Sequence, residues 1–352
     1  MRHIMRLNKP NEIALIESKD HVTSHEIMNE YLSLNEIYDE KIKHVFNRFF
    51  ALLHPFETIK TKVLSDYTPT KELIRITNAF MKIYEIAILI RRFLLKGTKI
   101  RMFDIASAPG MFILALEHFC NYYNLQLDWH ACSYMDGATT LKDTYKIYEN
   151  NPDRFTPCDV TKEEDMLRCM EKGKFDLVTG DIGIEHESDY STLQEFNQLD
   201  LQWGQAILGL KLTEQDGCMI LKMYTLLSEE THYLLDILCQ YFEQVNLVKP
   251  FTSRVFNDEC YIVCLKRNNV VCDSIPNMRP KISGYSSPNK ELILEFEHNR
   301  ASDKNKYSNM MIEILTQNPN STFKDAMKNN KYKKYYDETK KINQLFYRMK
   351  SH

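Results

Sequence analysis

Apolar and polar positions in the middle of the chain follow two alternating patterns. Short apolar runs, several of which end at Gly, Asp or Ser, predict buried strands at Ile100–Ile105, Leu127–Ser133, Phe175–Gly180, Cys218–Met223 and Cys260–Leu265. Longer amphipathic segments between them predict helices at Met111–Tyr123, Thr161–Glu171, Gln194–Lys211 and Glu229–Phe242. This alternation predicts an α/β fold, with a doubly wound, mostly parallel sheet that binds ligands at the carboxyl ends of its strands.

The two ends of the chain have a different character from residues 71–268, which hold the alternating pattern. Residues 1–70 are predicted to form a helical extension, because His25–Phe50 carries apolar residues close to a 3.6-residue period. Residues 269–352 begin with a Pro-rich loop and continue with predicted helices at Glu291–Arg300 and Tyr307–Thr316. The Lys-rich tail from Lys324 to Lys350 is interpreted first as a solvated helical face and second as a nucleic-acid contact.

Composition narrows the class of protein. Of the 352 residues, 43% are apolar and 26% charged, which indicates a globular protein. The net charge of −3 means that any basic surface must be local, and Lys71, Arg75, Lys82 and Arg254 are candidates beside the tail.

The nine cysteines form no Cys-x-x-Cys pair, so we expect buried free thiols, no metal and a reducing compartment. The charged N-terminus and the short apolar runs predict a cytoplasmic protein without a membrane segment.

The most informative loop follows the first predicted strand. Asp104 lies near the end of that strand, and the small residues of 106–110, hereafter the cofactor loop, lead into a helix at Met111. The loop lacks both the G-x-G-x-x-G and the G-K-[ST] patterns, which disfavours a dinucleotide-dependent dehydrogenase and a phosphate-binding loop. Small side chains and free N–H groups suit S-adenosylmethionine, although an ordinary strand-to-helix turn is the alternative. The predicted contacts in this stretch are Asp104, Ser107, Ala108, Pro109, Gly110, Met111 and Phe112.

Two later strand ends add candidate cofactor contacts. Ser133 closes the second strand, where an acid often binds ribose, and Asp136 follows it. Asp159 and Val160 follow a short segment, and Asp159 could accept a hydrogen bond from an adenine amino group. A lone Asp in a loop is otherwise a common turn former.

Four segments in order resemble the FtsJ-like RNA 2′-O-methyltransferases, which include viral cap methyltransferases. The segments are Asn78–Ile86, Asp176–Gly183, Asp216–Tyr224, and Thr252–Arg254 with Glu259–Val263. The Ser-Ala-Pro-Gly of the cofactor loop resembles the poxviral cap enzyme, and Asp181-Ile182-Gly183 resembles flaviviral ones. The similarity covers roughly residues 75–267 and implies a Rossmann-like methyltransferase that uses S-adenosylmethionine.

The resemblance also implies roles for individual residues. Lys82, Asp181, Lys222 and Glu259 would form a catalytic tetrad, with Asp181 also close to the cofactor. The residues implied to contact RNA are Arg75, Tyr224, Ser253 and Arg254. Two features depart from the family: Ser133 replaces an acid, and the acidic insertion Glu185–Tyr190 follows Asp181.

The tetrad suits the chemistry of ribose methylation. A 2′-hydroxyl must lose its proton as it attacks a methyl group, and a free Lys, with a pKa of about 10.4, is protonated at neutral pH. Neighbouring cations lower a Lys pKa and carboxylates raise it, so the sequence leaves the balance at Lys222 open. The alternatives are a structural Lys222–Asp181 ion pair, an exposed Lys82, and a Glu259 that only borders an edge strand.

Three functions remain compatible with these residues. The terminal extensions favour methylation of the first transcribed nucleotide of capped mRNA, cap 0 to cap 1, by an enzyme of a large DNA virus that acts with other capping or transcription proteins in the host cytoplasm or virion. The same chemistry on rRNA or tRNA is the second possibility. An inactive subunit that binds the cofactor and scaffolds an RNA-processing complex is the third.

Overall fold

The computed structural model describes residues 3–10, 77–135, 143, 145–183, 194–255, 257–282, 284–317 and 322–340. Several sequence predictions lie outside these residues: His25–Phe50, Lys71, Arg75, Asp136, Glu185–Tyr190 and the tail beyond residue 340. None of the described helices is both long enough and apolar enough to span a bilayer.

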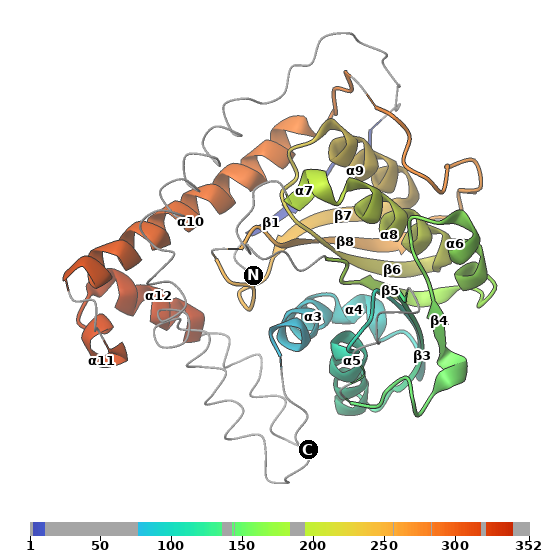
Figure 1. The fold of residues 1–352 in the computed structure, drawn as a ribbon, viewed down its shortest axis with the longest axis horizontal. Coiled ribbons are helices and arrows are strands. Elements are labelled where there is room, and N and C mark those ends of the chain that lie inside the picture. Colours follow the sequence, from blue (N-terminus) through green and yellow to red (C-terminus); the bar gives the residue numbers. More distant parts are fainter. Residues whose placement is uncertain are drawn as a thin grey trace.

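An eight-stranded sheet forms the centre of the described structure (Figure 1). Its strands are β1 (His3–Arg6), β2 (Lys99–Ile105), β3 (Gln126–Ser133), β4 (Phe155–Pro157), β5 (Phe175–Gly180), β6 (Thr213–Met223), β7 (Phe242–Lys249) and β8 (Cys260–Arg267). The order across the sheet is β1-β7-β8-β6-β5-β2-β3-β4. The five strands from β6 to β4 are parallel to one another, whereas β8 is antiparallel to β6 and β7, and β1 is antiparallel to β7. The predicted mostly parallel sheet is confirmed.

Helices cover both faces of the sheet. One face carries α3 (Asn78–Leu89), α4 (Arg91–Leu94) and α5 (Met111–Tyr122). The other carries α6 (Glu163–Met170), α8 (Leu199–Leu212) and α9 (Glu229–Tyr241), with the short α7 (Gln194–Asn197) before α8. Side-chain caps set two of the starts, since Thr77 accepts a hydrogen bond from Phe80 N and Ser228 accepts one from Thr231 N.

Alternation along each strand divides the core into two halves. Met102 and Leu177 pack toward α3 and α5, whereas Phe103 and Val178, their chain neighbours, pack toward α8. Successive strand side chains point to opposite faces, so a strand covered on both sides must be apolar throughout. This is why the central strands appear in the sequence as continuous apolar runs.

The N-terminal prediction was wrong where the structure tests it. Residues 1–70 were expected to be helical, but His3–Arg6 forms the edge strand β1, paired with β7 in the register Met5↔Leu247. β7 itself was not predicted. The short alternation of these two strands gains its partner only in the folded sheet, so neither produced a recognisable periodic signal.

The C-terminal extension is built around one long helix. The two predicted helices are parts of a continuous α10 (Lys290–Gln317), which is followed by α11 (Phe323–Ala326) and α12 (Asn330–Lys340). Tyr332 and Tyr335 of α12 are buried against α10 in a small separate core, while Lys331, Lys333 and Lys334 are exposed. The described part of the Lys-rich tail is therefore an amphipathic helix with a solvated basic face.

Close packing of α8 on the loop after β4 gives a test of this fold. A Cβ atom on Gly204 would lie 2.1 Å from the carbonyl oxygen of Val160, whereas one on Gly97 would meet nothing within 4 Å. Gly204→Ala should therefore destabilise the protein by about 1–3 kcal/mol, as overpacking usually does. Thermal unfolding of Gly204→Ala beside Gly97→Ala checks this, and equal melting temperatures would show that α8 does not approach Val160 so closely.

Candidate active site

Three strands and one helix bring the predicted tetrad together at the carboxyl edge of the sheet. Asp181 directly follows β5, and Lys222 is the penultimate residue of the parallel neighbour β6. Glu259 precedes β8, which starts at the same edge because it is antiparallel to β6. Lys82 reaches this edge from α3.

Lys82 and Glu259 form a buried ion pair. Lys82 Nζ lies 2.6 Å and 2.8 Å from the two carboxylate oxygens of Glu259, and the two residues are 7% and 9% exposed. Burial alone would raise the pKa of Glu259, but the charges of Lys82, Lys222 and Lys249 outweigh it and lower that pKa to about 2. Glu259 is therefore a carboxylate at every working pH, and neither the exposed-Lys82 nor the edge-strand alternative holds.

Lys222 is paired with Asp181 in a second, more open contact. Its Nζ lies 2.9 Å from Asp181 Oδ1 and donates a hydrogen bond to the Asp181 backbone oxygen at 3.0 Å. Burial favours the neutral amine, but the charges of Asp181 and Glu259 prevail and raise the pKa of Lys222 above its ordinary value. Without a further cation nearby, Lys222 is an ammonium group.

The loop after β5 approaches Lys222 so closely that only glycine fits at position 183. A Cβ atom there would lie 2.3 Å from the hydroxyl of Tyr224 and 3.0 Å from Lys222 Nζ. The Lys222 ammonium lies 5.7 Å from the centre of the Tyr224 ring. The Asp181-Ile182-Gly183 segment and Tyr224 therefore enclose the Lys222 ammonium.

Three buried polar residues that the sequence did not single out hold these loops. Glu85, one turn after Lys82, accepts hydrogen bonds from Phe251 N and Thr252 N. Lys249 donates to the backbone oxygens of Asn257 and Glu259. Gln205 of α8 donates to the Lys222 backbone oxygen. Their only sequence signal is a polar side chain in an apolar stretch, which does not reveal its partner.

The cofactor loop is held from beneath by a buried carboxyl group. Asp104 accepts hydrogen bonds from Ser107 Oγ at 2.5 Å and Thr179 Oγ1 at 2.6 Å, and burial raises its pKa to about 7. Tyr148 donates to Ser107 Oγ at 2.9 Å. Asp104 and Ser107 thus shape the loop, and both are buried.

The remaining loop residues lead directly into α5. Ala108 and Pro109 are partly exposed and joined by a cis peptide bond. Gly110 has φ +88° at the helix N-cap, a conformation that favours glycine. Met111 and Phe112 start α5 with buried side chains. Among these residues, the backbone and the partly exposed Ala108–Pro109 are what the loop offers to a ligand.

The other predicted cofactor residues lie beside this loop. Ser133 Oγ accepts a hydrogen bond from Ala108 N at 2.9 Å, so it orients the loop where an acid was expected in the family. Asp159 Oδ1 accepts from the backbone and hydroxyl of Thr161, and the side chain is partly exposed. Val160 is buried against α8.

The predicted RNA contacts differ in their exposure. Arg254 is partly exposed, whereas Tyr224 is 8% and Ser253 only 1% exposed. Ser253 Oγ donates to Asn257 Oδ1 at 3.1 Å and so bridges the loop between β7 and β8. Ser253 therefore supports the loop that presents Arg254.

Comparison with known proteins matches this arrangement to one family. The model of the FtsJ-like methyltransferases matches residues 76–267, which is more than half of the chain. The chain belongs to the FtsJ-like methyltransferase family. This confirms the resemblance that the motifs carried.

Relatives come from viruses and from animals. The chain is 32% identical over 231 residues to the probable methyltransferase EP424R of African swine fever virus, an alignment that covers 59% of this chain and 52% of the viral protein. It is 31% identical over 255 residues to the cap-specific mRNA (nucleoside-2′-O-)-methyltransferase 2 of Danio rerio, over 66% and 34% of the two chains. The chain thus spans about half the length of the viral relative and a third of the animal one.

Solved structures show weaker likeness. A ribosomal RNA methyltransferase from Plasmodium falciparum matches with a TM-score of 0.37 and 17% identity, over 53% of this chain and 96% of that one.

S-adenosylmethionine is the cofactor of this family, and the residues present fit it. The loop that joins β2 to the N-terminus of α5 lies at the carboxyl edge of the sheet, on the same side as Lys222. Its backbone can come close to a ligand because its side chains are small, and Asp159 places a partly exposed carboxylate after the neighbouring strand β4. The bound cofactor would supply a methyl group on a positively charged sulfur.

All nine cysteines are free and buried, as predicted. Cys132, Cys158 and Cys169 have their Sγ atoms within 4.8 Å of one another in the core. A structural zinc is held by four ligands, and this group of described residues offers three. We interpret the three thiols as core packing.

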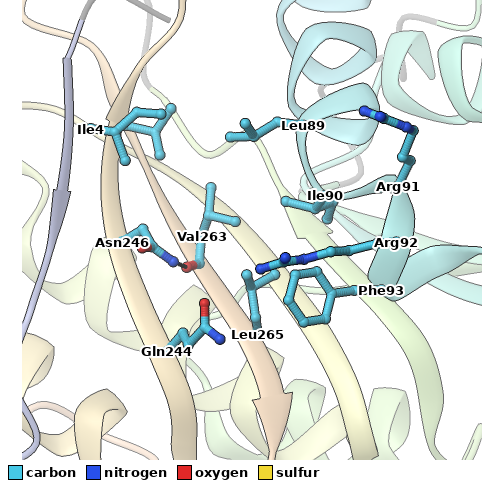
Figure 2. A pocket seen from close by; sticks show the side chains of 11 residues that line it. Ile4, Leu89, Ile90, Arg91, Arg92, Phe93, Gln244, Asn246, Val263 and Leu265 are labelled. Carbon is cyan, nitrogen blue, oxygen red and sulfur yellow. Dashed lines mark hydrogen bonds between the residues drawn. The ribbon is translucent and has the colours of Figure 1, made fainter.

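A pocket lies away from the tetrad (Figure 2). It has a volume of about 430 Å³ and lies between α3–α4 and the face of β1, β7 and β8. Its lining includes Leu89, Arg91, Arg92, Gln244 and Leu265, but neither tetrad nor cofactor-loop residues. Gln244 and Leu265 are near the opposite ends of their strands from the catalytic edge, so this pocket is not the cofactor site.

The buried Asp104 predicts an unusual pH dependence of stability. Because folding raises its pKa from about 4 to about 7, the folded state favours the protonated carboxyl group. Its contribution to stability is complete below pH 4 and is lost as the pH rises toward 7. The melting temperature of the wild type, relative to that of Asp104→Asn, should therefore fall between pH 4 and 7 and level off above.

The matched control is Asp153→Asn, which changes an exposed carboxylate in the same domain. Its melting temperature should follow that of the wild type across the whole range. A constant difference between wild type and Asp104→Asn from pH 4 to 8 would contradict the raised pKa.

Proposed function

We propose that this chain transfers a methyl group from S-adenosylmethionine to the ribose 2′-hydroxyl of the first transcribed nucleotide of capped mRNA. The observation that carries the proposal is the buried Lys82–Glu259 pair beside the Lys222–Asp181 pair at the carboxyl edge of the sheet. These residue types are what the transfer needs, because the hydroxyl must be oriented and must lose its proton as it attacks.

Lys222 is the residue that would contact the hydroxyl. As an ammonium group it can donate a hydrogen bond to the 2′-oxygen and hold it in line with the methyl group. It can accept the hydroxyl proton only after losing its own, and a positive charge brought close by the cofactor acts in that direction. Asp181 orients the ammonium group, while Glu259 and Lys82 surround it with fixed charges.

The capped substrate is supported by the relatives rather than by a recognisable pocket. The Danio rerio relative is a cap-specific mRNA 2′-O-methyltransferase, and the same activity names a relative in Trypanosoma brucei brucei that is 30% identical over 185 residues. The viral relative favours action in the cytoplasm or the virion, with other capping proteins as partners. The intact tetrad favours an active enzyme over an inactive scaffold subunit.

Replacing Lys222 tests the function. Lys222→Ala should lower methyl transfer by at least about 10²-fold, the lower range for a positioned acid–base group, with unchanged cofactor binding. Lys222→Arg should fail as well, because a guanidinium group stays protonated and does not reproduce a compact ammonium. The measurement is transfer of labelled methyl to capped, uncapped and ribosomal RNA, with the modified position mapped.

Melting curves and calorimetry with S-adenosylhomocysteine serve as controls for folding and cofactor binding. Near-normal turnover by a folded Lys222→Ala variant would reject the tetrad. Equal or faster methylation of ribosomal RNA by the wild type would move the substrate from capped mRNA to the second candidate.

The basic face of α12 is proposed to contact RNA. Lys324, Lys333 and Lys334 are exposed, and they lie on α11 and α12, next to the small core of Tyr332 and Tyr335. Replacing the three lysines with Gln should weaken RNA binding and flatten its salt dependence by up to about 0.7 log units per lost phosphate contact. Cofactor affinity and melting temperature should stay the same, since the buried tyrosines are untouched. Unchanged RNA affinity would leave these lysines as a solvated face.

A further inference from the structure

The C-terminal helix α10 places three charged residues on one face, and all three are buried. Glu297, Arg300 and Lys304 follow the spacing i, i+3, i+7, and they are 0%, 5% and 4% exposed. Charged side chains are rarely buried unless they are paired with specific partners. The partners of this face are residues of the catalytic loops.

Arg300 contacts the chain on both sides of the tetrad. Its Nη1 donates to the backbone oxygen of Tyr224 at 3.3 Å, two residues after Lys222. Its Nη2 donates to the backbone oxygen of Asp258, directly before Glu259. One rigid guanidinium group thus joins the segment that follows Lys222 to the segment that precedes Glu259.

Neighbouring charges fix the guanidinium and the same loop. Glu297 accepts from Arg300 Nη1 at 2.5 Å, and Lys304 pairs with the carboxylate of Asp258 at 3.0 Å. From the other side, Lys249 donates to the backbone oxygen of Glu259 at 2.6 Å. Burial and the charge of Arg300 lower the pKa of Lys249, while Glu259 opposes them.

The sheet explains why this support is needed. The β6–β8 ladder ends at the pair Met223↔Cys260, so Tyr224 and Glu259 lie just beyond the last paired residues. Strand pairing therefore no longer sets the separation of the two loops where the tetrad begins. The two donors of Arg300 act at this point.

We infer that Arg300 is a positioning residue, through which α10 fixes the separation of Lys222 and Glu259 for the methyl transfer. The inference rests on the proposed function for its kinetic consequence, but not for its structural one. It assigns the C-terminal extension a part in the active site that residues 76–267 alone do not supply.

The test replaces Arg300 with Lys. The variant keeps a positive charge beside Glu297, but a single ammonium group cannot reproduce the two-pronged reach of a guanidinium. We expect kcat to fall about 10- to 100-fold, because small misplacements of catalytic groups have effects of that size. The KM for S-adenosylmethionine, the affinity for S-adenosylhomocysteine and the melting temperature should remain close to those of the wild type.

A second measurement does not depend on activity. Hydrogen exchange followed by mass spectrometry should become faster in peptides that cover residues 224–228 and 257–260, and stay unchanged in the cofactor loop. Lys304→Gln, which removes only the ion pair with Asp258, should give a smaller loss of kcat than Arg300→Lys. Arg279→Lys is the matched control, since Arg279 bridges Asp200 and Glu230 and contacts no tetrad loop.

The possible results separate this inference from the proposed function. A wild-type protein that does not methylate RNA would reject the proposed function, while faster exchange in Arg300→Lys would still support the positioning role. Wild-type kcat and exchange in Arg300→Lys would overturn the inference. So would a general loss of stability and cofactor binding, which would make Arg300 a structural residue of the whole fold.

Discussion

Burial of charge at the carboxyl edge of the sheet is the constraint on which the site depends. An ammonium group taken out of water without a partner is strongly destabilising, so Lys82 and Lys222 must each meet a carboxylate. They do so within 3 Å, through Glu259 and Asp181. Since the four residues come from α3, β5, β6 and β8, the pairing requires these elements to meet in one register. The same contacts that satisfy the charges therefore place the chemical groups.

A second set of buried polar groups extends this control to the loops. Glu85 binds the turn after β7, Gln205 and Glu195 hold the segments after β5 and β6, and Arg300 joins Tyr224 to Asp258. Each bonds mainly to backbone, so it fixes the path of the chain. The tetrad side chains are thus carried on segments that cannot shift independently.

The raised pKa of Lys222 and the lowered pKa of Glu259 arise from this same clustering. Each group stabilises the charged form of its partner, and both outweigh the opposing effect of burial. A site built in this way holds fixed charges before any ligand arrives. Such preorganised charge is the form of electrostatic support that group transfer uses most effectively.

Local patterns in the sequence determined much of the fold. Continuous apolar runs identified the five central strands because a strand covered on both faces must be apolar at every position. Charged residues at the ends of two such runs, Asp181 and Lys222, identified one edge as chemical, and the motif order supplied Lys82 and Glu259. The tertiary structure alone decided the strands β1 and β7, the continuity of α10, and the roles of Glu85, Lys249 and Arg300. These depend on partners far away in the chain, such as Arg300 and Asp258, and a sequence pattern reports only on near neighbours. The sign of the Lys222 pKa shift was also undecidable from the sequence, because it depends on how burial balances against charges that only folding brings together.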